Sequence, residues 1–192
     1  MKRIDKSFII IVIVLLGMRL VNGSLSDPKE YLLHILIMLP GIIIGFTFHE
    51  FAHAFVSDRL GDPTPKNQEF LTSIAGVVMN LIIAFIMCFI LKALVYSDFA
   101  NTDAGDILIQ MAAYAVTINL VLMIFNLIPV PPLDGFGIIT QIFDLGKYSW
   151  YYTLYNNGFF ILLLLIVFNI TDMVITPGVN GIWNFMMDHI VY

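Results

Sequence analysis

The chain has 192 residues, of which 59% are hydrophobic and only 12% are charged. A soluble domain of this length carries roughly a quarter charged residues, so the composition excludes an ordinary soluble domain and indicates a lipid-embedded protein. The net charge of −5 includes no basic run, which excludes nucleic acid as an expected partner. The single cysteine, Cys88, excludes an internal disulfide and a cysteine metal site, and we expect it in the core.

Apolar stretches long enough to cross a bilayer as helices recur along the chain. We expect five spans, and a further segment rich in aromatic residues and methionine should form an interfacial helix at the C-terminus. The spans cover residues 7–21, 31–55, 74–96, 107–130 and 151–170, and the interfacial helix covers 176–192. The sequence therefore predicts an all-α, polytopic membrane protein.

The first span has two interpretations. Lys2, Arg3 and Lys6 precede its apolar core, as they would in a secretory signal peptide. No run of small residues precedes Ser24, where cleavage would fall, so the pattern favours an uncleaved anchor. The cleaved signal peptide remains the alternative.

The basic residues predict an orientation, because cytoplasmic loops of membrane proteins are enriched in lysine and arginine. With the N-terminus in the cytoplasm, the inner side carries Lys2, Arg3, Lys6, Arg59, Lys66 and Lys147, and the outer side carries Arg19, Lys29 and Lys92. The outer loop 97–106 then has three aspartates and no basic residue. We therefore expect an integral membrane protein with a cytoplasmic N-terminus, and Arg19 is the exception to the rule.

The stretch GIIIGFTFHEFAHAF, residues 41–55, places two histidines and a glutamate within an apolar span. His49 and His53 are four residues apart and share one helix face, where both imidazoles can reach one metal ion. Glu50 then lies beside the ion as a general base. Each such group costs several kcal/mol in a membrane unless it is paired, so a metal site is favoured. A metal-free hydrogen-bonded cluster is the alternative.

Gly41 and Gly45 continue the same helix face at the same spacing of four residues. A stripe of small residues allows another helix, or a guest peptide, to approach closely.

A catalytic zinc site commonly uses three protein ligands and leaves one position for water. Asp134 is the favoured third ligand, because the three prolines of NLIPVPPLDG, residues 126–135, must break the fourth span just before it. Irregular backbone at membrane depth is tolerated where it lines a polar cavity. Glu69 is the weaker rival, and an ordinary Asp-Gly turn is the structural alternative.

HEFAH at 49–53 together with NLIPVPPLDG at 126–135 resembles the site-2 protease family of intramembrane zinc metalloproteases. HEFAHAFVSDRLGDPTPKNQ, residues 49–68, is similar to the compact bacterial branch without appended soluble domains. The resemblance covers about residues 40–145. It implies one zinc ion per chain, held by His49, His53 and Asp134, with Glu50 as the base.

IAGVVMN, residues 74–80, resembles the family's Ala-Gly-Pro-x-x-Asn segment, with Val77 in place of the proline. The resemblance implies that Asn80 holds the substrate or its oxyanion; interhelical hydrogen bonding is the alternative. The segment of a few dozen residues that relatives insert before this helix is missing after Gln68.

The chain has no repeats, low-complexity tracts or soluble domain, so the sequence predicts a single membrane-embedded domain over 1–192, with an anchor and outer loop in 1–30, a catalytic core in 31–145, and a terminal span and tail in 146–192. The resemblance implies a transmembrane protein substrate, cleaved near the cytoplasmic side of a bacterial cell membrane. The alternatives are a zinc protease with a glutamate as third ligand, an inactive relative, and a metal-binding transporter. The sequence does not indicate an oligomeric state.

Overall fold

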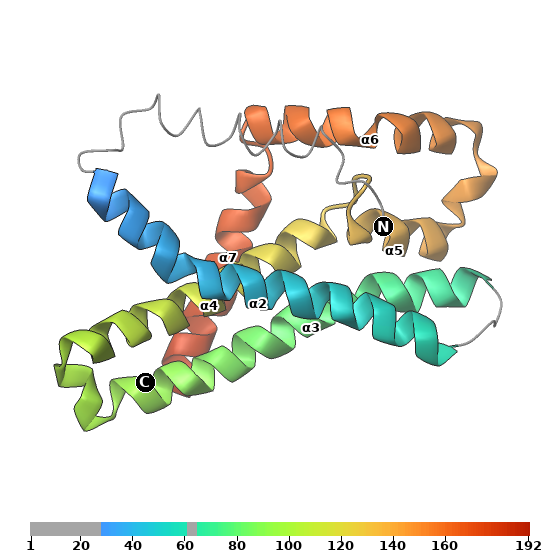
Figure 1. Ribbon diagram of the computed structural model, residues 1–192. Coiled ribbons are helices and arrows are strands. Elements are labelled where there is room, and N and C mark those ends of the chain that lie inside the picture. Colours follow the sequence, from blue (N-terminus) through green and yellow to red (C-terminus); the bar gives the residue numbers. More distant parts are fainter. Residues whose placement is uncertain (1–27, 61–64) are drawn as a thin grey trace. The chain divides into compact units, whose positions relative to one another are not determined.

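The computed structural model describes residues 28–60 and 65–192, and every regular element in them is helical (Figure 1). The elements are α2 (Pro28–Leu60), α3 (Pro65–Val95), η1 (Asp98–Asn101), α4 (Asp103–Leu127), α5 (Asp134–Phe143), η2 (Leu145–Lys147), α6 (Ser149–Val167), α7 (Asp172–Met186) and η3 (Met187–Val191). The described part divides into two units, with the boundary between Leu36 and Ile37 in α2. All candidate site residues lie in the second unit.

Four helices in the described ranges are long and apolar enough to cross a membrane. They cover Leu32–Leu60, Glu69–Val95, Asp103–Leu127 and Ser149–Val167. These four correspond to the last four expected spans, and the expected all-α, polytopic membrane fold is confirmed. The first expected span, 7–21, and its flanking residues Lys2, Arg3, Lys6 and Arg19 lie outside the described residues.

Two helices extend beyond their apolar stretches. Helix α2 continues to Leu60 instead of ending near residue 55, and α3 begins at Pro65 instead of near residue 74. Hydropathy marks only the part of a helix that suits a bilayer, whereas backbone hydrogen bonding continues through polar residues. A proline also fits the first position of a helix, because the N–H that it lacks would have no partner there.

The core forms around α3 and α4, which run side by side (Figure 1). Its buried residues include Ala84 and Cys88 of α3 and Val116 and Leu120 of α4, so Cys88 is a core residue as expected. The close packing of these two helices gives the site a rigid support.

Helix α7 and η3 cover most of the expected C-terminal interfacial helix. Val179, Met186 and Val191 are buried in the same cluster as α3 and α4. The Lys92 ammonium donates a hydrogen bond to the Ile190 carbonyl oxygen at 2.6 Å. The tail is therefore packed onto the helical core and fastened at the C-terminal end of α3.

Helix α2 approaches α4 closely at the two glycines that the sequence singled out. A Cβ on Gly41 would lie 2.8 Å from Ala115 Cα, and a Cβ on Gly45 would lie 2.7 Å from Leu122 Cδ1. Both distances are too short for real contacts. At Gly41 the neighbour is backbone, so glycine is required there, whereas at Gly45 the neighbour is the end of a flexible side chain that can shift. The contact fixes the part of α2 that leads directly into His49 and His53.

Gly41→Ala is expected to destabilise the protein by about 1–3 kcal/mol, because the new methyl group would meet the α4 backbone. Gly181→Ala is the matched control, since nothing lies within 4 Å of a Cβ there. This control should be neutral or stabilising by up to about 1 kcal/mol through helix propensity. Unfolding of both variants in detergent measures the difference, and equal stabilities would contradict the close packing.

The fourth span breaks where the prolines predict. Helix α4 ends at Leu127, residues 128–133 are irregular with a cis peptide bond between Pro131 and Pro132, and α5 begins at Asp134. Gly158 of α6 lies directly against the Pro131 backbone. The break therefore presents Asp134 in the first turn of α5, where the helix dipole favours a negative charge.

Candidate metal centre

Three side chains from two distant segments meet at one point. His49 Nε2 lies 3.0 Å from His53 Nε2, and Asp134 Oδ2 lies 3.2 Å and 3.3 Å from these two nitrogens. Within the described residues, this trio is the group of histidine, cysteine or acidic side chains that could hold a metal ion. The trio combines one helical turn of α2 with the start of α5.

The spacing of the three atoms fits a tetrahedral zinc site. With ligand bonds of about 2.0–2.1 Å, the corners of a tetrahedron lie about 3.3 Å apart. The three observed separations of 3.0, 3.2 and 3.3 Å are close to that value. Two imidazole nitrogens and one carboxylate oxygen are also a donor set that suits zinc and leaves one corner for water.

The alternative of a metal-free hydrogen-bonded cluster fits the geometry less well. Asp134 Oδ2 is buried and makes no hydrogen bond, although two imidazole nitrogens lie within 3.3 Å of it. The two Nε2 atoms are within hydrogen-bond distance of each other, and the buried Oδ2 between them is left without a hydrogen bond. Such an arrangement is what a bound cation requires.

The second nitrogen of His53 indicates which of its ring atoms can bind a metal. Its Nδ1 lies 2.7 Å from the Thr72 carbonyl oxygen of α3. A carbonyl oxygen only accepts hydrogen bonds, so Nδ1 carries the proton. In the neutral ring the lone pair is then on Nε2, which faces the other two groups of the trio.

His49 is buried against α3. Its Nδ1 lies 3.1 Å from the side-chain amide nitrogen of Asn80, and the Asn80 side chain is completely buried. Asn80 thus contacts His49 at Nδ1, the ring nitrogen that does not face Asp134.

Glu50 and Glu69 lie outside the trio. The Glu50 side chain is exposed, next in sequence to His49. The Glu69 carboxylate accepts a hydrogen bond from the Gln141 amide, and Asp134 is the acidic group that meets the two imidazoles. Asp134, and not its rival Glu69, is therefore the carboxylate that the fold brings to the two imidazoles.

Two residues near the trio were not given a role by sequence reasoning. Thr72 contributes a backbone carbonyl, which no side-chain pattern reveals. A Cβ on Gly76 would lie 2.6 Å from His53 Nε2 and 2.5 Å from His49 Cε1. Gly76 does lie within the IAGVVMN segment, so the resemblance of its Ala-Gly pair to the family segment is the sequence feature that could have indicated a role for it.

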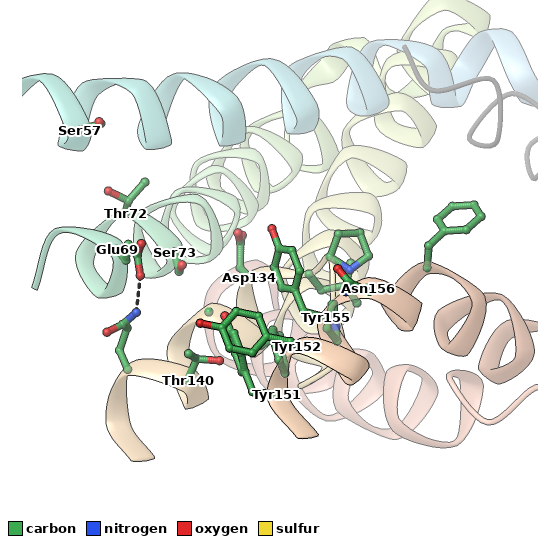
Figure 2. A pocket seen from close by; sticks show the side chains of 17 residues that line it. Ser57, Glu69, Thr72, Ser73, Asp134, Thr140, Tyr151, Tyr152, Tyr155 and Asn156 are labelled. Atoms are coloured by element: carbon green, nitrogen blue, oxygen red, sulfur yellow. Dashed lines mark hydrogen bonds between the residues drawn. The ribbon is translucent and has the colours of Figure 1, made fainter. Parts of the chain in front are cut away.

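A cavity of about 960 Å³ lies beside Asp134 (Figure 2). Tyr151, Tyr152 and Tyr155 of α6 line one wall, and Thr72 of α3 lies on another (Figure 2). Phe136 of α5 stacks on Tyr151 with ring centroids 5.6 Å apart, which holds the start of α6 at this wall. Asp134 therefore borders a space lined with hydroxyl groups and aromatic rings.

Comparison with known proteins gives consistent matches. Residues 94–166 match the model of peptidase family M50. YwhC of Bacillus subtilis, which is named as a zinc metalloprotease, is 30% identical over 184 residues, covering 73% of this chain and 84% of YwhC. Zinc metalloprotease MJ0392 of Methanocaldococcus jannaschii is 25% identical over 189 residues, covering 87% of this chain and half of MJ0392. No solved structure matches the chain.

The YwhC alignment also bears on the missing segment. Its 184 positions include only 73% of the 192 residues, so part of YwhC within the aligned stretch has no counterpart here. The length of that part, a few dozen residues, is that of the segment missing after Gln68. The identity to YwhC and the share of YwhC that is covered establish the family: the chain belongs to peptidase family M50, the site-2 protease family of zinc metalloproteases whose two motifs it carries.

Proposed function

We propose that the protein is an intramembrane zinc metalloprotease that cleaves a locally unwound transmembrane segment of a membrane protein near the cytoplasmic side. The observation that carries the proposal is the convergence of His49, His53 and Asp134 beside a cavity, in a chain of the site-2 protease family. These three residues would hold one zinc ion per chain. A bound zinc ion lowers the pKa of its water and polarises the carbonyl that is attacked.

Glu50 would be the general base. Its carboxylate accepts a proton from the attacking water and returns it to the nitrogen of the leaving amine. Its exposed position next to His49 leaves it free for this transfer, since it contributes no atom to the trio. An oxyanion role for Asn80, which the family resemblance implies, remains a prediction.

The lining of the cavity suits a peptide substrate whose helix has locally unwound. In lipid, an unwound segment exposes backbone N–H and C=O groups that cannot bond to water and must find other partners. The hydroxyl groups of Tyr151, Tyr152 and Tyr155, together with the hydroxyls of α3, are suitable partners beside Asp134. The cavity therefore suits an extended polar backbone within an otherwise apolar setting.

We also propose that the N-terminus is cytoplasmic in a bacterial cell membrane. Arg59 lies in the last turn of α2, which precedes α3, and Lys147 lies in η2. The element before η2, α5, contacts the beginning of α3 through the hydrogen bond between Gln141 and Glu69. Lys92 lies in the last turn of α3. The positive-inside rule then places the beginning of α3 at the cytoplasmic side.

A series of single-span substrates tests this function. Cleavage by the purified protein should be at least about tenfold faster when glycine, asparagine or proline replaces leucine near the cut, because these residues weaken the helix. Products are identified by mass spectrometry, and removal of zinc with a chelator is the control. Failure to cleave any member of the series with zinc bound would contradict the proposed protease and favour an inactive relative.

A further inference from the structure

We infer that one face of α3 orients both imidazoles of the trio, and that Asn80 is the positioning residue that selects the metal-binding tautomer of His49. The inference rests on the proposed zinc site. Thr72, Gly76 and Asn80 are spaced four residues apart and therefore share one face of α3. This face is the α3 cradle.

The α3 cradle contacts both rings at the Nδ1 atom. The Thr72 carbonyl oxygen lies 2.7 Å from His53 Nδ1, and the Asn80 amide lies 3.1 Å from His49 Nδ1. The two rings meet edge to face, with centroids 4.6 Å apart. Each imidazole thus has Nδ1 against α3 and Nε2 toward Asp134.

Gly76 allows the two imidazole rings to lie against α3. It lies between the two polar contacts, and a Cβ there would be 2.5 Å from one ring and 2.6 Å from the other. Real Cβ atoms essentially never approach other atoms so closely, so any side chain at this position would displace the rings. The glycine allows the rings to rest directly on the helix.

The tautomer of His53 and the tautomer of His49 are determined by different kinds of hydrogen-bond partner. The partner of His53 is a backbone carbonyl, which can only accept a hydrogen bond. The partner of His49 is a side-chain amide, which can present either its NH₂ group or its oxygen. The tautomer of His49 therefore depends on Asn80.

The two orientations of the Asn80 amide correspond to the two tautomers of His49. With Nδ2 toward the ring, Oδ1 is buried and has no hydrogen-bond partner. A rotation of the amide by 180° brings Oδ1 to Nδ1, where a proton on Nδ1 satisfies it. The same proton leaves the lone pair of His49 on Nε2. The metal-binding tautomer of His49 therefore goes with the orientation of Asn80 that presents Oδ1 to Nδ1.

Zinc affinity tests this role independently of catalysis. In the purified full-length protein in detergent, Asn80→Leu should weaken Zn²⁺ binding about 10- to 100-fold, as loss of such outer partners does elsewhere. Asn80→Asp should bind within about threefold of the wild type, because a carboxylate also accepts from Nδ1–H. Competition with a chelator measures these affinities.

Asn119→Leu is the matched control. Asn119 is also completely buried, but its amide donates to the Ala115 carbonyl oxygen within its own helix. Its substitution should leave Zn²⁺ affinity unchanged. Circular dichroism of the metal-free variants reports their folding separately.

Unchanged zinc affinity in Asn80→Leu, with cleavage lost, would overturn the inference and assign Asn80 to the substrate. Equal losses in Asn80→Leu and Asn80→Asp would overturn it as well. Should Asn80→Leu fail to fold, the ¹⁵N shifts of the His49 ring in the metal-free wild type decide: a proton on Nδ1 supports the inference, and a proton on Nε2 contradicts it. A protein that binds zinc but cleaves nothing would contradict only the proposed function.

Discussion

Glu50→Gln is expected to lower cleavage of a single-span substrate by about 10²- to 10⁴-fold, the usual contribution of a positioned general base. Glutamine has nearly the same size but cannot accept the proton from the attacking water. Zinc content should stay at the wild-type level, because Glu50 contributes no atom to the trio. Cleavage rate and zinc per chain, measured on the same preparation, test both parts.

Asp58→Asn is the matched control for this experiment. Asp58 is an exposed carboxylate on the same helix, eight residues beyond Glu50, so its conversion to an amide should leave cleavage unchanged. Cleavage retained in Glu50→Gln would remove this residue as the base. Loss of zinc from that variant would show that Glu50 supports the metal site.

The trio also explains why an apolar helix carries ionisable residues. An isolated ionisable group is expensive at membrane depth, and such groups occur where they pair with one another or line a cavity. His49 and His53 pair across one turn with Asp134, and Asp134 borders the cavity. A bound cation would further offset the charge of the carboxylate.

Local patterns in the sequence predicted much of the fold and the contents of the site. Apolar length indicated the four long helices, since a bilayer demands about twenty apolar residues for each. The spacing of His49 and His53 placed them on one face, and the prolines before Asp134 broke the chain there. These features depend on residues that are close together in the chain, so the sequence alone can predict them.

Features that depend on tertiary contacts could not be predicted in the same way. The carbonyl of Thr72 has no side-chain signature, and the importance of Gly76 appears only when both rings lie on it. The burial of Met186 and Val191 likewise depends on which helices their segment meets. The sequence alone also left Glu69 as a rival, because nothing local shows that it pairs with Gln141.

The central claim is that two imidazoles of α2 and the carboxylate that follows the proline break hold one zinc ion. Zinc per chain in the wild type, Asp134→Ala and Glu69→Ala tests it most directly. The wild type and Glu69→Ala should each hold one zinc ion. Asp134→Ala should lose affinity by more than the 10- to 100-fold that removal of an outer partner costs. Full zinc in Asp134→Ala, with loss in Glu69→Ala, would contradict the claim.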